Sequence, residues 1–293
     1  MRILLTGPSG FLGSALANYW AEQGHELFLL ARASSSLHRI HQSPLSTHVI
    51  RFNSLHEIPE ILCTTQPEVI VHTACNYGRN GESVLNLLEA NVQYGLMLIH
   101  ALLEYTKDEN KRITFLNTGT ILSPDISFYA LSKKQFSDWG ASLSTQSHGR
   151  LQFINILLQQ LYGPGDDKSK FITQVIEACR TNQPQLKLTA GNQKRDLIYI
   201  DDAVSAYDVI LKNSNNFSNN DSIDVGYGQA TTIREFAELT KKISAANTIL
   251  DFGAIPYRVN EAMLCIANIT RLKSLGWNPS VSLEDGLRRV LKN

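Results

Sequence analysis

Three glycines spaced three residues apart follow the apolar stretch Met1–Leu5 and precede a segment with helical periodicity, Ser14–Gln23. The apolar stretch predicts a buried strand, so the glycines fall in a turn between a strand and a helix. In such a turn the first glycine makes the tight bend, the second lets the backbone approach a pyrophosphate, and the third lets the helix pack closely on the strand. The turn therefore predicts a dinucleotide-binding site, whose contacts are expected from Gly7, Ser9, Gly10, Phe11, Leu12 and Gly13.

Composition narrows the class of protein. The chain has 293 residues, 43% of them hydrophobic, which suits one large domain or two intimate ones. No apolar run reaches the roughly 18 residues of a membrane span. Basic and acidic residues number 27 each, so there is no general electrostatic case for a nucleic-acid or membrane partner. The strand at Met1–Leu5 leaves no room for a signal peptide, and we expect a cytoplasmic protein without a metal site.

Apolar strands alternate with helical segments through the first half of the chain. The further predicted strands are Glu26–Ala31, His48–Phe52, Glu68–His72, Arg112–Leu116 and Leu151–Leu158. This alternation predicts an α/β fold with a Rossmann-type doubly wound parallel sheet. The pattern changes at Tyr162, so we expect a dinucleotide-binding domain over residues 1–162 and a smaller α/β substrate-binding lobe over 163–293. Part of 190–212 is expected to pack back on the first domain.

The end of the second predicted strand bears on the choice of cofactor. An acidic residue there would accept hydrogen bonds from a ribose 2′-hydroxyl, whereas Arg32 suits a 2′-phosphate, and no carboxylate follows before Glu57. The sequence therefore favours NADPH (NADP+). Beyond the glycine-rich turn, we expect contacts with the cofactor from five further residues. They are Arg32, Asn53 near the adenine, and His72, Thr73 and Ala74 at the end of the fourth strand. A structural role is expected for the His72 imidazole rather than a catalytic one.

Tyr129 and Lys133 form the leading catalytic pair. Positions i and i+4 share one face of a helix, and this helix is predicted to run towards Thr145. A phenol has an ordinary pKa near 10, so it transfers protons at neutral pH only when positive charge such as that of Lys133 stabilises the phenolate. Thr118 lies at the end of the preceding strand. We expect it to hydrogen-bond the substrate oxygen with which Tyr129 exchanges its proton.

The polar loop Cys75–Ser83 follows the fourth predicted strand. Ligands bind at the carboxyl ends of the strands in open α/β sheets, so Asn76, Tyr77 and Arg79 are substrate candidates. An ordinary surface loop is an equal alternative. Further along, Asp201-Asp202 is expected to cap the helix Ala203–Leu211 rather than bind a metal.

With these motifs the chain resembles the extended short-chain dehydrogenase/reductases of the nucleotide-sugar epimerase/dehydratase type over nearly its whole length. Within that family it is most similar to the synthases of CDP-3,6-dideoxyhexoses (paratose and abequose), which reduce a 4-keto sugar nucleotide with NADPH. The stretches that carry the narrower resemblance are Tyr77-Gly78-Arg79 with Glu82-Ser83, Lys187-Leu188-Thr189 continuing to Gln193-Lys194-Arg195-Asp196, and Arg258-Val259-Asn260-Glu261.

The resemblance implies roles for individual residues. Tyr129 would donate a proton to the keto oxygen, Lys133 would lower the phenol pKa and hold the nicotinamide ribose, and Thr118 would orient the oxygen. Arg195 and Arg258 would lie against the nucleotide diphosphate, where arginine pairs well with phosphate. Gln160 stands where many relatives have an asparagine that touches this diphosphate.

The same resemblance implies a reaction and an assembly. The family's dehydratases carry Thr-Asp-Glu where this chain has Thr118-Gly119-Thr120, which speaks against a 4,6-dehydratase. A homodimer through the helices of Asn86–Leu103 and Tyr129–Thr145 is expected, although an apolar stripe there can equally belong to the core.

The leading interpretation is a cytoplasmic NADPH-dependent oxidoreductase of dideoxyhexose and lipopolysaccharide O-antigen biosynthesis. It would reduce a nucleotide-linked 4-keto-deoxyhexose, expected to be CDP-4-keto-3,6-dideoxyglucose, to CDP-paratose or CDP-abequose. Two alternatives stay open. An NAD-dependent nucleotide-sugar 4-epimerase is disfavoured by Arg32, and a non-catalytic NADP-sensing protein is disfavoured because Tyr129 and Lys133 are both present.

Overall fold

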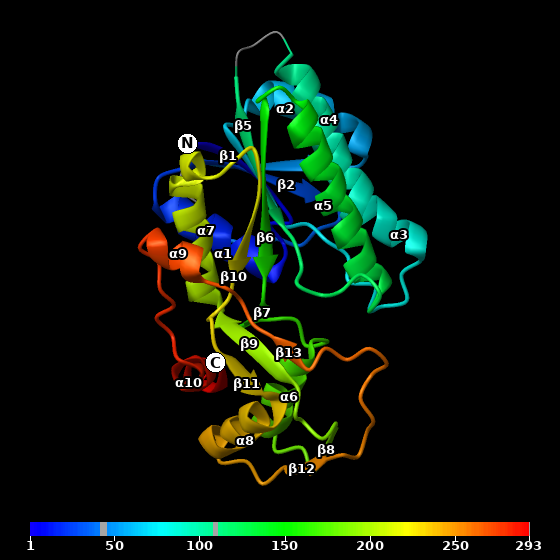
Figure 1. Ribbon diagram of the computed structural model, residues 1–293, viewed down its shortest axis with the longest axis vertical. Coiled ribbons are helices and arrows are strands. Elements are labelled where there is room, and N and C mark those ends of the chain that lie inside the picture. The colour runs from blue at the N-terminus through cyan, green and yellow to red at the C-terminus, as the bar shows by residue number, and fades with distance from the viewer. Residues whose placement is uncertain (42–45, 108–110, 293) are drawn as a thin grey trace. The chain divides into compact units, whose positions relative to one another are not determined.

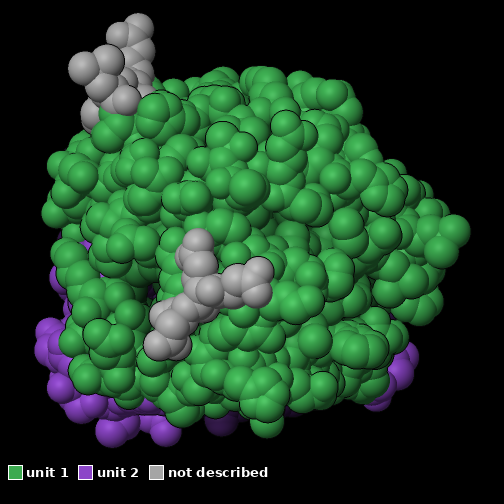
Figure 2. Space-filling model, turned by 90° about the horizontal axis from the view of Figure 1, so that it is seen from above, with its two compact units in different colours: residues 1–157, 210–223 green, residues 158–209, 224–293 purple. Residues whose placement is uncertain are grey.

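The computed structural model describes residues 1–41, 46–107 and 111–292. The chain divides into two compact units, coloured separately in Figure 2. The first unit comprises residues 1–157 and 210–223, and the second comprises 158–209 and 224–293. Each unit is described in turn.

A seven-stranded sheet organises the first unit, in the order β10-β6-β5-β4-β1-β2-β3. Its strands are β1 (Arg2–Thr6), β2 (Glu26–Arg32), β3 (Thr47–Phe52), β4 (Val69–His72), β5 (Ile113–Thr118), β6 (Leu151–Leu158) and β10 (Asn220–Val225). Every pairing among β1 to β6 is parallel, with β2 on one side of β1 and β4 on the other. The strand order thus reverses at β1, which places a ligand crevice at the carboxyl ends of β1 and β4.

Helices cover both faces of this sheet (Figure 1), which is why its central strands are apolar almost throughout. The helices are α1 (Phe11–Glu22), α2 (Ile58–Thr65), α3 (Val84–Leu88), α4 (Tyr94–Tyr105) and α5 (Phe128–Gln146). The core beneath α2, α4 and α5 includes Ile58, Leu98 and Phe136 packed with strand residues such as Leu4 and Phe115. The predicted doubly wound α/β fold is confirmed.

The second unit is a smaller α/β lobe. It contains β7 (Gln160–Tyr162), α6 (Phe171–Arg180), β8 (Gln185–Leu188), β9 (Lys194–Tyr199), β11 (Ala230–Thr232), α8 (Ile233–Ser244), β12 (Ile249–Phe252), β13 (Leu264–Cys265), α9 (Thr270–Ser274) and α10 (Leu283–Lys292). Strand β9 lies between β11 and β13 and also pairs with β7, while β8 pairs with β12. Helix α7 (Ile200–Lys212) follows β9 and ends in the first unit.

The predicted capping role of Asp201-Asp202 is wrong. Helix α7 begins at Ile200, so both acids lie inside its first turn. The Asp202 carboxylate instead accepts hydrogen bonds from the Ser280 backbone N–H and hydroxyl, at 2.9 and 2.8 Å, and from the Val281 N–H at 2.9 Å. The acid therefore fixes the segment before α10, a partner nearly 80 residues away that local sequence does not reveal.

Candidate cofactor and active site

The glycine-rich turn has the shape that a pyrophosphate needs. Gly7 lies in the left-handed region at φ +70°, and the Gly10 N–H donates to its carbonyl at 3.0 Å. A β-carbon on Gly13 would lie 2.1 Å from that same carbonyl oxygen, so only glycine permits this approach of α1 to the turn. Helix α1 begins at Phe11 and its first N–H groups face the turn, which suits an anion.

The end of β4 is fastened to the glycine turn through Thr6. The Thr73 hydroxyl donates to the Thr6 carbonyl at 2.7 Å, and the Ala74 N–H donates to the Thr6 hydroxyl at 3.3 Å. A β-carbon on Gly7 would lie 2.7 Å from the Ala74 nitrogen. Thr73 and Ala74 therefore lie directly against the turn, whereas the fastening role of Thr6 was not predicted.

The His72 side chain is buried and packed within the first unit. The imidazole is fully buried, and its Nδ1 lies 2.9 Å from the Thr6 hydroxyl oxygen. The rings of Tyr94, Phe115 and Phe136 surround it at centroid distances of 5.3 to 5.8 Å. Burial lowers the pKa of His72 to about 3, with the Lys133 charge acting in the same direction, so the imidazole is neutral at pH 7. The buried imidazole fits the expected structural role, and the cofactor contact expected at His72 stays a prediction.

The loop after β2 is held by arginines. Arg32 is half exposed and forms an ion pair with Glu89 at 3.4 Å. Arg51 donates to the backbone carbonyls of Ala33 and Ser35, at 3.0 Å each, and so shapes the loop beyond Arg32. Sequence analysis missed Arg51, because a single exposed arginine in a strand gives no sign of its partner.

Two further residues border the cofactor turn. The Asn53 backbone N–H donates to the Glu57 carboxylate at 3.0 Å, while its side chain is exposed. Arg39, also missed, donates to the carbonyl of Ser9 in the glycine turn at 3.1 Å. The segment after Arg32 is thereby tied back to the turn.

Tyr129 and Lys133 lie one turn apart on α5, whose first turn is capped by a hydrogen bond from the Ala130 N–H to the Ser127 hydroxyl. Tyr129 is half-buried, and Lys133 is only 2% exposed. Burial lowers the pKa of the Lys133 ammonium below its ordinary value, and the nearby Cys75 thiol acts in the opposite direction. Thr118 is the last residue of β5, the strand that precedes this helix.

A buried polar network fixes the helical turn that carries Lys133. The Asn117 side-chain amide donates to the Asn155 Oδ1 at 2.8 Å, across neighbouring positions of β5 and β6. The Ser137 hydroxyl lies 3.2 Å from the same Asn155 oxygen and 3.0 Å from the Lys133 carbonyl. Such buried networks give a helix one defined position on the sheet.

Asn91 links the substrate-candidate loop to α5, the helix of the candidate catalytic pair. It is fully buried in a π-helical segment, Glu89–Gln93. Its Oδ1 accepts from the Asn76 N–H at 2.7 Å, and its Nδ2 donates to the Asn76 carbonyl at 2.8 Å and to the Ser132 hydroxyl at 2.9 Å. A break in a helix can signal a functional segment, but the sequence showed one continuous helical pattern there.

Two of the substrate candidates, Tyr77 and Arg79, lie near Tyr129, the candidate catalytic residue. The ring of Tyr77 lies against the ring of Tyr129 in a tilted arrangement, with centroids 4.9 Å apart and an angle of 33° between their planes. The Arg79 guanidinium lies over the Tyr77 ring, 4.7 Å from its centroid. Asn76 accepts a hydrogen bond from the Gly78 N–H at 2.9 Å and so forms the bend between these two side chains.

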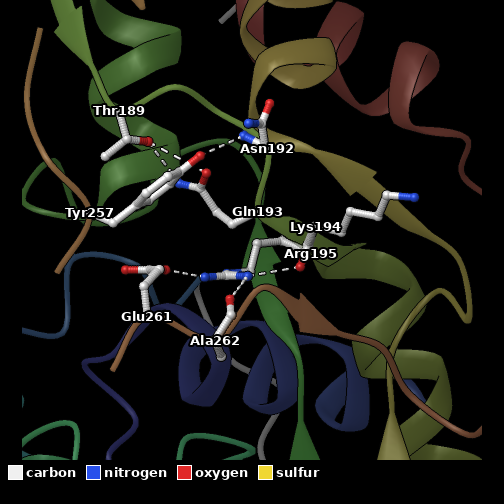
Figure 3. A network of polar contacts seen from close by, with 8 residues as sticks. All are labelled: Thr189, Asn192, Gln193, Lys194, Arg195, Tyr257, Glu261 and Ala262. Atoms are coloured by element: carbon white, nitrogen blue, oxygen red, sulfur yellow. Dashed lines mark hydrogen bonds and ion pairs between the residues drawn. The ribbon is translucent and has the colours of Figure 1, made fainter. Parts of the chain in front are cut away.

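The remaining substrate candidates lie in the second unit. Arg195 forms an ion pair with Glu261 and donates to the Ala262 carbonyl at 2.6 Å (Figure 3). Arg258, three residues before Glu261, is exposed, and Gln160 in β7 is half-buried. The structure thus brings Arg195 and the segment of Arg258 together.

Asp196, the neighbour of Arg195, serves the fold. It is fully buried and accepts hydrogen bonds from the backbone N–H groups of Tyr227, Gly228 and Ala267 at 2.7 to 3.1 Å. Burial raises the pKa of Asp196, while these three donors lower it.

Over residues 1–41, 46–107 and 111–292, no three His, Cys, Asp or Glu side chains lie together as they would to hold a metal ion. No helix in those ranges is long and apolar enough to cross a membrane.

Known proteins were compared with this chain. Residues 3–226 match the family model described as the NAD dependent epimerase/dehydratase family. Two similar proteins are CDP-abequose synthases: that of Salmonella typhimurium is 28% identical and that of Salmonella muenchen 30% identical, each alignment covering 99% of this chain and 97% of the relative.

Solved structures agree on the fold. The UDP-glucose 4-epimerase of Thermotoga maritima, solved with UDP-glucose, superposes with a TM-score of 0.83 at 20% identity over 100% of this chain and 98% of that one. WbmF of Bordetella bronchiseptica, solved with NADH, gives a TM-score of 0.80 at 19% identity, over 99% of this chain and 90% of that one. The glycine turn, the Tyr/Lys pair and the family match lead to one conclusion: this chain is an enzyme of the NAD dependent epimerase/dehydratase family.

Proposed function

We propose that the protein is an NADPH-dependent reductase of a nucleotide-linked 4-keto-deoxyhexose. The substrate we favour is CDP-4-keto-3,6-dideoxyglucose, and the product would be CDP-paratose or CDP-abequose. The observation that carries the proposal is the pairing of half-buried Tyr129 with buried Lys133 on α5, in the unit that holds the glycine turn. The similarity to CDP-abequose synthases over the whole chain supports the substrate class.

The chain's own residues supply the proton chemistry. When bound, NADPH supplies the hydride that reduces the C4 ketone. Tyr129 donates its phenolic proton to the keto oxygen, and Lys133 stabilises the phenolate that remains. Because Lys133 is buried, its charge is weakly screened and acts strongly on neighbouring groups. Thr118 orients the oxygen, so catalysis rests on positioning and on stabilising the developing negative charge.

The cofactor would be held by the glycine turn, with Thr73 and Ala74 beside it. A pyrophosphate fits the turn because Gly7 and Gly13 leave a space that β-carbons would fill. Arg32 is proposed to bind the 2′-phosphate of NADPH. Its partner Glu89 is half exposed, so the ion pair can open at small cost.

The substrate contacts are proposed on two grounds: contacts in the structure and the resemblance to the family. Asn76, Tyr77 and Arg79 are proposed because their loop contacts the catalytic helix. Arg195, Arg258 and Gln160 are proposed for the nucleotide diphosphate by resemblance. A CDP-linked substrate is the specific proposal among nucleotide sugars.

A homodimer is proposed from an exposed apolar surface on the first unit. It is formed by Val84, Leu85 and Leu88 of α3 and Phe128, Leu131 and Trp139 of α5, with exposed fractions of 37 to 76%. Exposed apolar side chains on two helices that contact each other favour association. These six residues are exposed, whereas Leu98, Ile99 and Leu102 within Asn86–Leu103 are buried in the core.

The experiment follows NADPH absorbance with purified protein and enzymatically generated CDP-4-keto-3,6-dideoxyglucose, beside NADH and a Tyr129→Phe variant. Consumption of one NADPH per sugar, abolished in the variant, supports the reductase, and NMR of the product distinguishes paratose from abequose. Interconversion of 4-hydroxyl epimers without net NADPH consumption would instead indicate the epimerase. Binding of NADPH without turnover of any keto-sugar nucleotide would indicate a sensing protein.

A further inference from the structure

The loop after β4 places an aromatic ring and a positive charge next to the catalytic phenol. The Tyr77 and Tyr129 rings are 4.9 Å apart, and the Arg79 guanidinium is 4.7 Å from the Tyr77 ring. Together the two distances put the guanidinium within about 10 Å of the Tyr129 ring. Building on the proposed reductase function, we propose that Tyr77 and Arg79 are positioning residues that orient and polarise the catalytic Tyr129.

The loop is rigid enough for this role because its backbone is held on both sides. Asn91 binds the Asn76 N–H and carbonyl and also the Ser132 hydroxyl, three residues along α5 from Tyr129. The Ser132 hydroxyl in turn donates to the Tyr129 carbonyl at 2.9 Å. One buried amide thus joins the backbone of the loop to the backbone at the catalytic residue.

The bend at Gly78 directs the two side chains. Gly78 lies at φ +67°, and a β-carbon there would come within 3.1 Å of the Leu87 side chain. Its N–H is bound by the Asn76 side chain at 2.9 Å. The loop therefore returns within two residues, which lets the Arg79 guanidinium lie over the ring of Tyr77.

The contacts have two physical consequences for Tyr129. A ring packed against Tyr129 limits rotation of the phenol and so holds its hydroxyl in one direction, which matters because proton transfer requires close alignment. A guanidinium over an aromatic face is attracted by that face and also favours negative charge on the nearby phenol. Arg79 is exposed, so its electrostatic effect is screened and small, whereas buried Lys133 remains the principal charge.

The groups that face this phenol can be separated by mutation. Lys133 lies one turn from Tyr129 on α5, with Cys75 acting on Lys133, and Tyr77 and Arg79 come from the loop after β4. Arg79→Gln removes only the loop's charge, Tyr77→Leu removes the ring contact, and Tyr77→Phe keeps the ring. Arg112→Gln is the matched control, because Arg112 is exposed and precedes β5 at the end of the strand opposite Thr118.

The first measurement needs no substrate, so it stands even if the proposed reaction is wrong. Protein labelled with 13Cζ-tyrosine is titrated by NMR, and Tyr129→Phe identifies the Tyr129 signal. Arg79→Gln should move the titration midpoint of Tyr129 to higher pH by a few tenths of a unit, the size expected for one screened charge at ~10 Å. Tyr77→Leu should change the chemical shift of Tyr129 and broaden its line, while Tyr77→Phe and Arg112→Gln should leave it like the wild type.

Turnover provides the second measurement. Tyr77→Leu should lower kcat roughly 3- to 10-fold and Arg79→Gln about twofold, each with the KM for NADPH unchanged, while Arg112→Gln should keep the wild-type kcat. An unchanged Tyr129 signal in both Tyr77→Leu and Arg79→Gln would overturn the proposal. So would an effect confined to the KM for the sugar nucleotide, which would leave these residues as substrate contacts without a positioning role. If the proposed substrate is not turned over, kcat cannot be measured. The NMR titration of Tyr129 then still decides whether Tyr77 and Arg79 act on it.

Discussion

The α-carbon of Gly13 faces the carbonyl oxygen of Gly7 so closely that a β-carbon at residue 13 would lie 2.1 Å from that oxygen and 2.8 Å from the Thr73 hydroxyl. The first turn of α1, the glycine turn and the end of β4 therefore meet at one point. Both contacts involve groups that cannot move aside, because one is backbone and the other is hydrogen-bonded to Thr6 at 2.7 Å.

Gly13→Ala should consequently destabilise the fold, whereas Gly10→Ala should mainly affect cofactor binding. An alanine at 13 forces the helix away from the strand and should cost about 1–3 kcal/mol in the free energy of unfolding. At residue 10 a β-carbon meets only the Gly7 carbonyl at 3.3 Å, so stability should change by less than ~1 kcal/mol while NADPH affinity falls. Urea unfolding and a binding titration of both variants test this, and equal stability of the two would contradict it.

The buried imidazole of His72 should make stability fall in acid. The pKa is about 3 in the folded protein, against an ordinary value of 6.5, so between these values the unfolded chain binds a proton that the folded chain excludes. The stability contributed by this group is complete above pH 6.5 and is lost as pH falls towards 3. From pH 7 to pH 5 the wild type should lose about 2 kcal/mol more than His72→Phe.

Urea unfolding at the two pH values measures this difference. His100→Phe is the control, since His100 is exposed on α4. This variant should lose as much unfolding free energy between pH 7 and pH 5 as the wild type. Parallel pH dependence in the wild type and His72→Phe would show that the imidazole is accessible to protons in the folded state.

Cofactor preference should depend on the Arg32–Glu89 pair. If Arg32 binds a 2′-phosphate, Arg32→Ala should weaken NADPH binding roughly tenfold, the value of one charge-assisted contact, and leave NADH binding nearly unchanged. Glu89→Gln removes a competing carboxylate 3.4 Å away and should strengthen NADPH binding. Fluorescence titrations with both cofactors are the measurement, with Arg180→Ala as the control. Equal losses for NADPH and NADH in Arg32→Ala would rule out the phosphate contact.

Association should depend on the exposed surface of α3 and α5. Trp139 is 55% exposed on α5, and Trp139→Glu would place a charge in the middle of an apolar interface. Light scattering during gel filtration should find a dimer for the wild type and a monomer for the variant. Ile249→Glu, which alters a similarly exposed apolar residue on β12, should remain dimeric. A monomeric wild type would refute the proposed assembly.

The parts of the site that the sequence revealed are those encoded locally. The glycine spacing around Gly7 and the i,i+4 spacing of Tyr129 and Lys133 depend on one turn of backbone, and the apolar strands have both faces buried. In the second unit, β9 begins with Lys194-Arg195-Asp196. The polar composition of these three residues does not indicate a strand. Strands of a small sheet with an exposed face lack the continuous apolar signal.

The residues that sequence analysis missed act through partners distant in the chain. Thr6 fastens residues 72–74, Asn91 joins Asn76 to Ser132, and Asn117 meets Asn155 across the sheet. Each is a small polar residue in an element whose local pattern predicts only a strand or helix. Their roles depend on which strands become neighbours, and that follows from the topology of the whole unit.

The central claim is that hydride reaches the C4 carbon of a keto-sugar nucleotide while Tyr129 protonates the oxygen. The most direct measurement supplies CDP-4-keto-3,6-dideoxyglucose with NADPH deuterated at both C4 positions of the nicotinamide and locates the deuterium in the product by NMR. The account predicts one deuterium at C4 of the dideoxyhexose and at least a 10²-fold slower incorporation in Tyr129→Phe. A product without deuterium at C4, or full incorporation in Tyr129→Phe, would contradict it.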